Sequence, residues 1–172
     1  HVFRNSPKAL HFIDPADIEY RKSDFLSTLN EISQFIDILS INENECNSLS
    51  SAIGYAPLIP NFETYTADDV KSAAKVLAEK IGISVDLHTR RGAAWSNGNE
   101  ILFVHPINVE PKTLTGAGDS WDAADIVGYL AGLEPKERLL FSNACASLYV
   151  RNPLGEPPTM NEVVDILDRI SM

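Results

Sequence analysis

The chain has 172 residues, of which 44% are hydrophobic, and this length and composition suit one domain with a substantial core. The formal net charge of −10 at pH 7 argues against a broad nucleic-acid or anionic-membrane surface, because such a surface requires clustered Lys and Arg. The sequence contains no apolar run of membrane-spanning length and no signal peptide, so a cytoplasmic location is the default expectation.

The first third of the sequence alternates apolar runs with amphipathic segments. Leu10–Asp14 and Ile38–Ile41 are short apolar runs typical of buried strands. Between them, apolar residues at helical spacing predict a helix over Ser23–Asp37. A short helix is expected over Asn42–Ile53, and the two prolines in Gly54–Thr66 indicate a loop.

The middle of the sequence predicts one strong helix followed by strands. Ala67–Ile81 is amphipathic, begins after a capping residue, Thr66, and ends before Gly82. Three strands are expected next: Ser84–His88, Ala93–Ser96 and Glu100–His105. The last two flank Asn97-Gly98, a dipeptide typical of β-hairpin turns.

The last third is predicted to be helical, over Gly116–Leu133, Lys136–Val150 and Met160–Ile170. The preceding alternation of strand and helix is typical of an α/β fold with a mostly parallel sheet and helices on its faces. We therefore expect a single domain over residues 1–172. The two cysteines, Cys46 and Cys145, have neither CxxC nor zinc-binding spacing, so reduced, buried thiols are expected.

The stretch KTLTGAGDSWDAADIVGYLAG, which begins at Lys112, carries the clearest chemical signal. Glycines let the backbone approach an anion, and a helix start offers free amides, so Gly116–Gly118 is a candidate anion hole. Asp119 would repel a static phosphate, but a base beside an anion hole can deprotonate a hydroxyl that attacks a phosphoryl group. The alternative is an ordinary acid in the first turn of a helix. The GxxxxGK[ST] motif is absent, and Trp121 replaces the third glycine of GxGxxG.

This stretch is similar to the signature of the ribokinase-like carbohydrate kinases, the PfkB family, whose usual form is DTxGAGDxF followed by a small-residue helix. Four residues match: Gly116, Ala117, Gly118 and Asp119. The resemblance implies that Asp119 is the catalytic base, that the GAG amides form the anion hole and that Thr115 belongs to the nucleotide site. Thr113-Leu114 replaces the Asp-Thr that begins the family signature.

The segment INENECNSL resembles the NxxE segment of the same family, with Asn42 and Glu45 at the matching positions. The resemblance implies that this pair organises Mg²⁺ and its water ligands near the phosphates. One carboxylate and an amide suffice for that role, because Mg²⁺ keeps several waters. The alternative is that Asn42 caps a helix and Glu45 completes its capping box, and the two roles are compatible.

Three further segments fall in the family's order. HTRRGAAW resembles the turn over the nucleotide, which implies nucleotide contacts for Thr89, Arg91 and Gly92, although Thr89 replaces the family's first glycine. SNACASLYVRNPLG resembles the late helix that borders the adenine, which makes Asn143 a candidate, the alternative being an asparagine on the helix surface. FIDPADIEYR resembles a segment whose Arg meets the acceptor in some members, and Arg21 is the residue that could do so here, although it comes late.

The resemblance extends from about Asp14 to about Gly155 and corresponds only to the later part of a ribokinase-like kinase. It implies a three-layer α/β sandwich whose N-terminal strands and lid are not in this chain. It also implies ATP and Mg²⁺ as cofactors, a sugar, sugar acid or nucleoside as acceptor, and a homodimer through the missing lid region.

Two other functions remain open at this level. One is a non-catalytic nucleotide-binding or regulatory module on the same fold, which Thr113, Leu114 and Thr89 favour because each replaces a common family residue. The other is a Rossmann-type dinucleotide binder. The missing third glycine and the position of the glycine turn after the strands, rather than before them, argue against the second.

Overall fold

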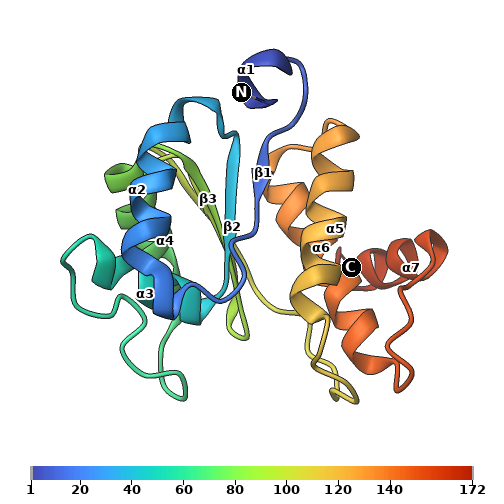
Figure 1. Ribbon diagram of the computed structural model, residues 1–172. Helices are drawn as coiled ribbons and strands as arrows, with labels where there is room; N and C mark the ends of the chain where they lie inside the picture. Colours follow the sequence, from blue (N-terminus) through green and yellow to red (C-terminus); the bar gives the residue numbers. More distant parts are fainter. Residues whose placement is uncertain (1, 172) are drawn as a thin grey trace. The chain divides into compact units, whose positions relative to one another are not determined.

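The computed structural model describes residues 2–171, and the chain forms two compact units, His1–Phe103 and Val104–Met172. Figure 1 labels the helices and strands of both units. The single-domain organisation expected from the sequence stays a prediction.

The first unit is built on a five-stranded sheet with the strand order β1-β2-β3-β4-β5. The strands are β1 (Phe12–Ile13), β2 (Ile38–Ile41), β3 (Ser84–Thr89), β4 (Gly92–Ser96) and β5 (Ile101–Val104). β2 runs parallel to both β1 and β3, with Leu39 opposite Val85, whereas β4 runs antiparallel to β3. The predicted mostly parallel sheet is therefore confirmed, and the Asn97-Gly98 turn joins its last two strands.

Helices connect the parallel strands, because a parallel pair needs a crossover. They are α2 (Lys22–Ile32), α3 (Glu43–Ala52) and α4 (Ala67–Ile81), and a short α1 (Val2–Asn5) precedes the sheet. The three longer helices lie together on one side of the sheet (Figure 1). α4 has the boundaries that the sequence predicts: Thr66 caps its first turn, and Gly82 adopts a left-handed conformation directly after its last residue.

The core of this unit lies between α4 and the sheet. Buried residues of α4 recur every three or four positions, and alternate residues of β2 and β3 face them. They include Val70, Ala74, Leu77, Leu39, Ile41, Val85 and Leu87, all of them fully buried.

Two predicted elements of this unit are shorter than expected. The helix over Ser23–Asp37 ends at Ile32 and continues as a 3₁₀ turn, because Ile36 is already extended where the chain enters β2. The first strand is reduced to Phe12–Ile13. Its extension ends there because the Asp14 carboxylate accepts the amide of Ala16 at 3.0 Å, which closes a tight turn around a proline.

The second unit consists of α5 (Ala117–Leu130), α6 (Pro135–Arg151) and α7 (Met160–Ser171), as the sequence predicts. Its small apolar core contains Ala124, Ala144, Cys145, Leu148 and Val163. A buried ion pair between Asp125 of α5 and Arg138 of α6 joins the two helices, which lie side by side in Figure 1.

Two other expectations can be compared with this structure. Cys46 and Cys145 are both buried and free, so the predicted reduced thiols are confirmed. Within the described part of the chain, none of the helices combines the length and apolar character needed to cross a membrane.

Candidate active site

The glycine turn forms the start of α5 in the second unit. Gly116 is the residue before the helix and has a left-handed backbone, with φ of 85°. The Ala117 amide donates to the carbonyl of Leu114 at 3.2 Å, and the Ser120 amide donates to that of Gly116 at 2.9 Å. The amides of Gly116, Gly118 and Asp119 donate to no acceptor within the described residues. Three backbone N–H groups at the positive end of the helix are therefore available to an anion.

Asp119 lies in the first turn of α5, and its side chain is exposed. Together with Gly116 and Ser120 it lines one end of a cavity of about 460 Å³ in the second unit. Apolar side chains line the rest of this cavity: Val127, Phe141, Tyr149, Met160 and Val163 among them. The Asp119 carboxylate makes no hydrogen bond to another described residue. Its accessibility and its place beside free amides match what a general base at an anion hole requires.

The C-terminal end of α6 holds the segment that leads into this turn. The hydroxyl of Tyr149 donates to the carbonyl oxygen of Thr115 at 2.9 Å. The amides of Lys112 and Thr113 donate to the carbonyl of Val150 at 2.7 and 3.1 Å. Sequence reasoning missed Tyr149, and no motif in the chain identifies it, because its contact joins two segments far apart in the sequence.

Asn42 and Glu45 occupy the start of α3 in the first unit and form a capping box, as the structural alternative predicted. The side-chain oxygen of Asn42 accepts the amides of Asn44 and Glu45 at 2.9 and 3.1 Å. The Glu45 carboxylate accepts the Asn42 amide at 2.8 Å. Glu45 is only 5% exposed. Burial raises the pKa of Glu45 to about 7, and the negative charges of Asp14 and Asp17 add to this rise.

Oxygen donors surround a cavity of about 710 Å³ beside this helix start. Its lining includes Asp17, Glu19, Asn42, Glu45 and Ser48. Carboxylate and amide oxygens are the ligands that Mg²⁺ prefers, and a cation would favour the charged form of Glu45 that burial disfavours. Within residues 2–171, no three His, Cys, Asp or Glu side chains are grouped to hold a metal directly. The carboxylate and amide oxygens of this lining are compatible with Mg²⁺ that keeps most of its water ligands.

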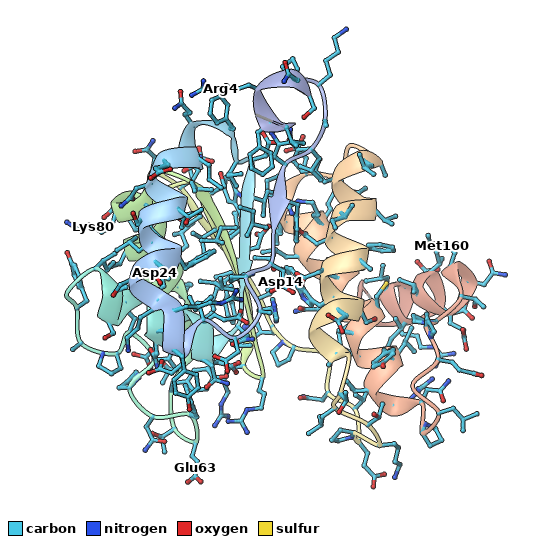
Figure 2. The ribbon with its side chains drawn as sticks, in the orientation of Figure 1. Arg4, Asp14, Asp24, Glu63, Lys80 and Met160 are labelled. Atoms are coloured by element: carbon cyan, nitrogen blue, oxygen red, sulfur yellow. The ribbon has the colours of Figure 1, made fainter. Side chains whose placement is uncertain are left out.

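The turn between β3 and β4 contains Thr89 and Gly92, with the two arginines between them. The Thr89 hydroxyl donates to the Gly92 carbonyl at 2.7 Å and accepts the Arg91 amide at 3.1 Å. The Arg91 guanidinium donates to the carbonyl of Glu63 at 2.6 Å. Glu63 lies in the loop that connects α3 to α4 (Figure 2). Arg91 thus anchors this loop with one of its nitrogens, and its guanidinium keeps further N–H donors.

Glu43 brings these two parts of the first unit together. One oxygen of its carboxylate accepts the Arg90 amide at 3.0 Å and the Tyr65 hydroxyl at 2.6 Å. The start of α3 and the β3–β4 turn consequently lie at the same edge of the sheet, where β2 and β3 end. In open α/β sheets this edge is the usual place for a ligand.

Asn143 of α6 is buried rather than exposed on the helix surface, with an exposed fraction of 7%. Its side-chain oxygen accepts the indole N–H of Trp121 at 2.9 Å, and its side-chain nitrogen donates to the carbonyl of His105 at 3.0 Å. Asn143 therefore links α5, α6 and the segment after β5.

In the first unit, the Arg21 guanidinium donates to the carbonyl of Pro15 at 3.1 Å and closes the segment after β1.

The chain is 36% identical over 80 residues to the ribokinase of Bacillus subtilis (strain 168), an alignment that covers 45% of this chain and 27% of that relative. Among solved structures, the Thermotoga maritima ribokinase is 24% identical with a TM-score of 0.71, covering 94% of this chain and 50% of that one. This similarity concerns the fold.

The Arabidopsis thaliana ribokinase, solved with ribose and ATP, is 29% identical with a TM-score of 0.64. That match covers 80% of this chain and 43% of the Arabidopsis protein. The chain therefore spans half or less of the length of these relatives, and its fold is ribokinase-like. The family model of the pfkB family carbohydrate kinases matches residues 7–160, and the chain belongs to this family.

Proposed function

We propose that this chain carries the phosphoryl-transfer half of an ATP-dependent kinase that phosphorylates a hydroxyl of a small sugar, sugar acid or nucleoside. One observation carries the proposal: the exposed carboxylate of Asp119 stands in the same helix turn as three amides without protein acceptors. An anion hole alone would bind phosphate better without the acid. The pairing suits a reaction in which an attacking hydroxyl loses its proton while negative charge moves past the helix start.

In this proposal, residues of the second unit accept the proton and stabilise the charge of the phosphoryl group. Asp119 accepts the proton of the acceptor hydroxyl as the hydroxyl oxygen attacks the γ-phosphorus of ATP; the bond from that phosphorus to the β,γ-bridging oxygen breaks, and ADP leaves with the electron pair. Within the Gly116–Gly118 turn, the amides of Gly116 and Gly118 donate to the phosphoryl oxygens together with that of Asp119, and the helix dipole adds to the stabilisation of the charge; the Ala117 amide already donates to the Leu114 carbonyl. Thr115, directly before the turn, belongs to the proposed nucleotide site.

The remaining contacts in this proposal are those that the family pattern implies for the nucleotide and for Mg²⁺. Thr89, Arg91 and Gly92 are assigned to the nucleotide phosphates and ribose, with Asn143 of the second unit near the adenine. Asn42 and Glu45 are assigned to Mg²⁺ through its water ligands, and the ion supplies charge neutralisation on the phosphates when it is bound. The ribose and ATP bound to the Arabidopsis relative support this choice of donor and acceptor.

The proposal also covers the partners, the location and the oligomeric state of the enzyme. The acceptor is a small molecule, and Arg21 is the residue of this chain assigned to contact it. The net charge of −10 disfavours nucleic acid and anionic membranes as partners. A cytoplasmic homodimer, formed through a lid that this chain does not contain, completes the proposal.

The test is turnover of ATP with Mg²⁺ against a panel of sugars, sugar acids and nucleosides, with the chain in its natural polypeptide. Asp119→Asn keeps the shape of the side chain and removes the base, so we expect kcat to fall by about 10²- to 10⁴-fold with ATP affinity retained. Asp165→Asn, an exposed aspartate of α7, is the matched control and should leave kcat unchanged.

A second function, a nucleotide-binding or regulatory module without catalysis, has specific support. Thr113 replaces the acid that begins the family signature, and the side chains of Arg91 and Asn143 are already engaged with protein carbonyls. This module would bind ATP, transfer phosphate to no acceptor in the panel and be indifferent to Asp119→Asn. That result would reject the kinase proposal.

A further inference from the structure

The side chain of Tyr149 contacts the glycine turn from α6, a segment distant in the sequence. Its ring is half-buried, and its hydroxyl donates to the Thr115 carbonyl oxygen at 2.9 Å. The same hydroxyl lies so close to Gly116 that a Cβ at that position would collide with it, and a Cβ at Gly155 would lie 3.1 Å from it. Two glycines therefore leave space for one hydroxyl.

The contact has a consequence for the amides of the turn. A peptide group is planar and trans, so the carbonyl oxygen of Thr115 and the N–H of Gly116 point in opposite directions. A hydrogen bond that holds the carbonyl toward Tyr149 directs the Gly116 amide away from it. This amide has no acceptor among the described residues, and neither do the amides of Gly118 and Asp119 in the first turn of the helix that follows.

We propose that Tyr149 is a positioning residue that holds the Thr115–Gly116 peptide in the orientation required for an anion hole. Tyr149 touches neither the phosphoryl group nor the acceptor in this role. The two hydrogen bonds from Lys112 and Thr113 to Val150 support it by holding the preceding residues to the same end of α6. This inference rests on the proposed phosphoryl transfer.

The test compares the wild type with Tyr149→Phe, which removes one oxygen atom and keeps the ring. A net hydrogen bond of this kind is worth a factor of about 2 to 12 in an equilibrium, so we expect kcat to fall about 3- to 10-fold. The KM for ATP should stay within about twofold, because the orientation matters most when charge develops on the phosphoryl group. Tyr129→Phe on α5 is the matched control, since its hydroxyl makes no hydrogen bond to another described residue.

A binding measurement separates positioning from general stability. ADP with aluminium fluoride mimics the phosphoryl group in transfer, whereas ADP alone does not. We expect Tyr149→Phe to weaken the binding of ADP with aluminium fluoride by the same factor by which it lowers kcat. The affinity for ADP alone and the midpoint of thermal unfolding should be retained.

The remaining outcomes overturn the inference in distinguishable ways. If Tyr149→Phe matches the wild type in kcat and in aluminium fluoride binding, the positioning role fails while the kinase proposal stands. If the variant loses ADP affinity and thermal stability together with kcat, Tyr149 is a packing residue. A wild type that neither transfers phosphate nor binds ADP with aluminium fluoride rejects both proposals.

Discussion

Replacing Gly116 by alanine tests the geometry of the glycine turn through stability alone, independently of any activity. Gly116 has φ of +85°, and an added Cβ would collide with the Tyr149 hydroxyl and lie 3.1 Å from the ring carbon Cζ. Gly132 is the matched control in the same unit, since it has φ of +76° but nothing within 4 Å of an added Cβ. The two substitutions share the backbone cost and differ in the collision.

The expected magnitudes follow from these two terms. A left-handed backbone costs an alanine about 1–2 kcal/mol, which is the whole cost expected for Gly132→Ala. Overpacking adds about 1–3 kcal/mol at Gly116, so Gly116→Ala should destabilise by about 2–5 kcal/mol. In a Tyr149→Phe background the colliding oxygen is gone, and the cost of Gly116→Ala should fall by about 1–2 kcal/mol.

Urea denaturation at pH 7, followed by the fluorescence of the buried Trp121, measures these differences. The double-mutant cycle between Gly116→Ala and Tyr149→Phe isolates the coupling between the two positions. Equal costs for Gly116→Ala and Gly132→Ala, together with zero coupling, would show that Tyr149 does not pack against the turn. The physical reasoning behind the positioning role would then be wrong.

Two further predictions concern the buried polar groups. The pKa of Glu45 is raised to about 7, so the native state binds the carboxyl proton more tightly than the unfolded chain does. The contribution of the protonated Glu45 to stability is therefore present below about pH 4.5 and is lost as the pH rises to about 7. The full pKa shift corresponds to about 3 kcal/mol of unfolding free energy, which partial solvation reduces to about 1–2 kcal/mol. Urea denaturation between pH 5 and 8 should show this decrease in the wild type and not in Glu45→Gln. Parallel plots of unfolding free energy against pH for the two proteins would refute the prediction. Asn143→Ala removes the acceptor of the Trp121 indole N–H and the donor to the His105 carbonyl. We expect the free energy of unfolding, measured by urea denaturation, to fall by about 2–4 kcal/mol. A decrease below about 0.5 kcal/mol would mean that neither hydrogen bond contributes to stability.

The sequence predicted those parts of the protein whose determinants are local. The helix over Ala67–Ile81 has the predicted bounds because its cap, its apolar spacing and the glycine that ends it are all within a few residues of one another. The glycine turn that begins α5 was recognisable for the same reason, since Gly116–Asp119 is contiguous. The Asn42–Glu45 capping box likewise depends on residues three positions apart, and the structure contains it.

The tertiary structure decided which partners the polar side chains take, because those partners come from distant segments. The nucleotide contact of Arg91 stays a prediction, and the hydrogen bond of its guanidinium to the Glu63 carbonyl depends on the packing of the α3–α4 loop, which no motif in the sequence indicates. Asn143 is buried between Trp121 and the His105 carbonyl, which excludes the helix-surface alternative, whereas its place beside a nucleotide stays a prediction. Tyr149 carries no motif, and only the folding of α6 against the segment before α5 brings its hydroxyl to Thr115. Local patterns determine where a helix or turn forms, whereas a side-chain hydrogen bond depends on which backbone group the folded chain leaves beside it.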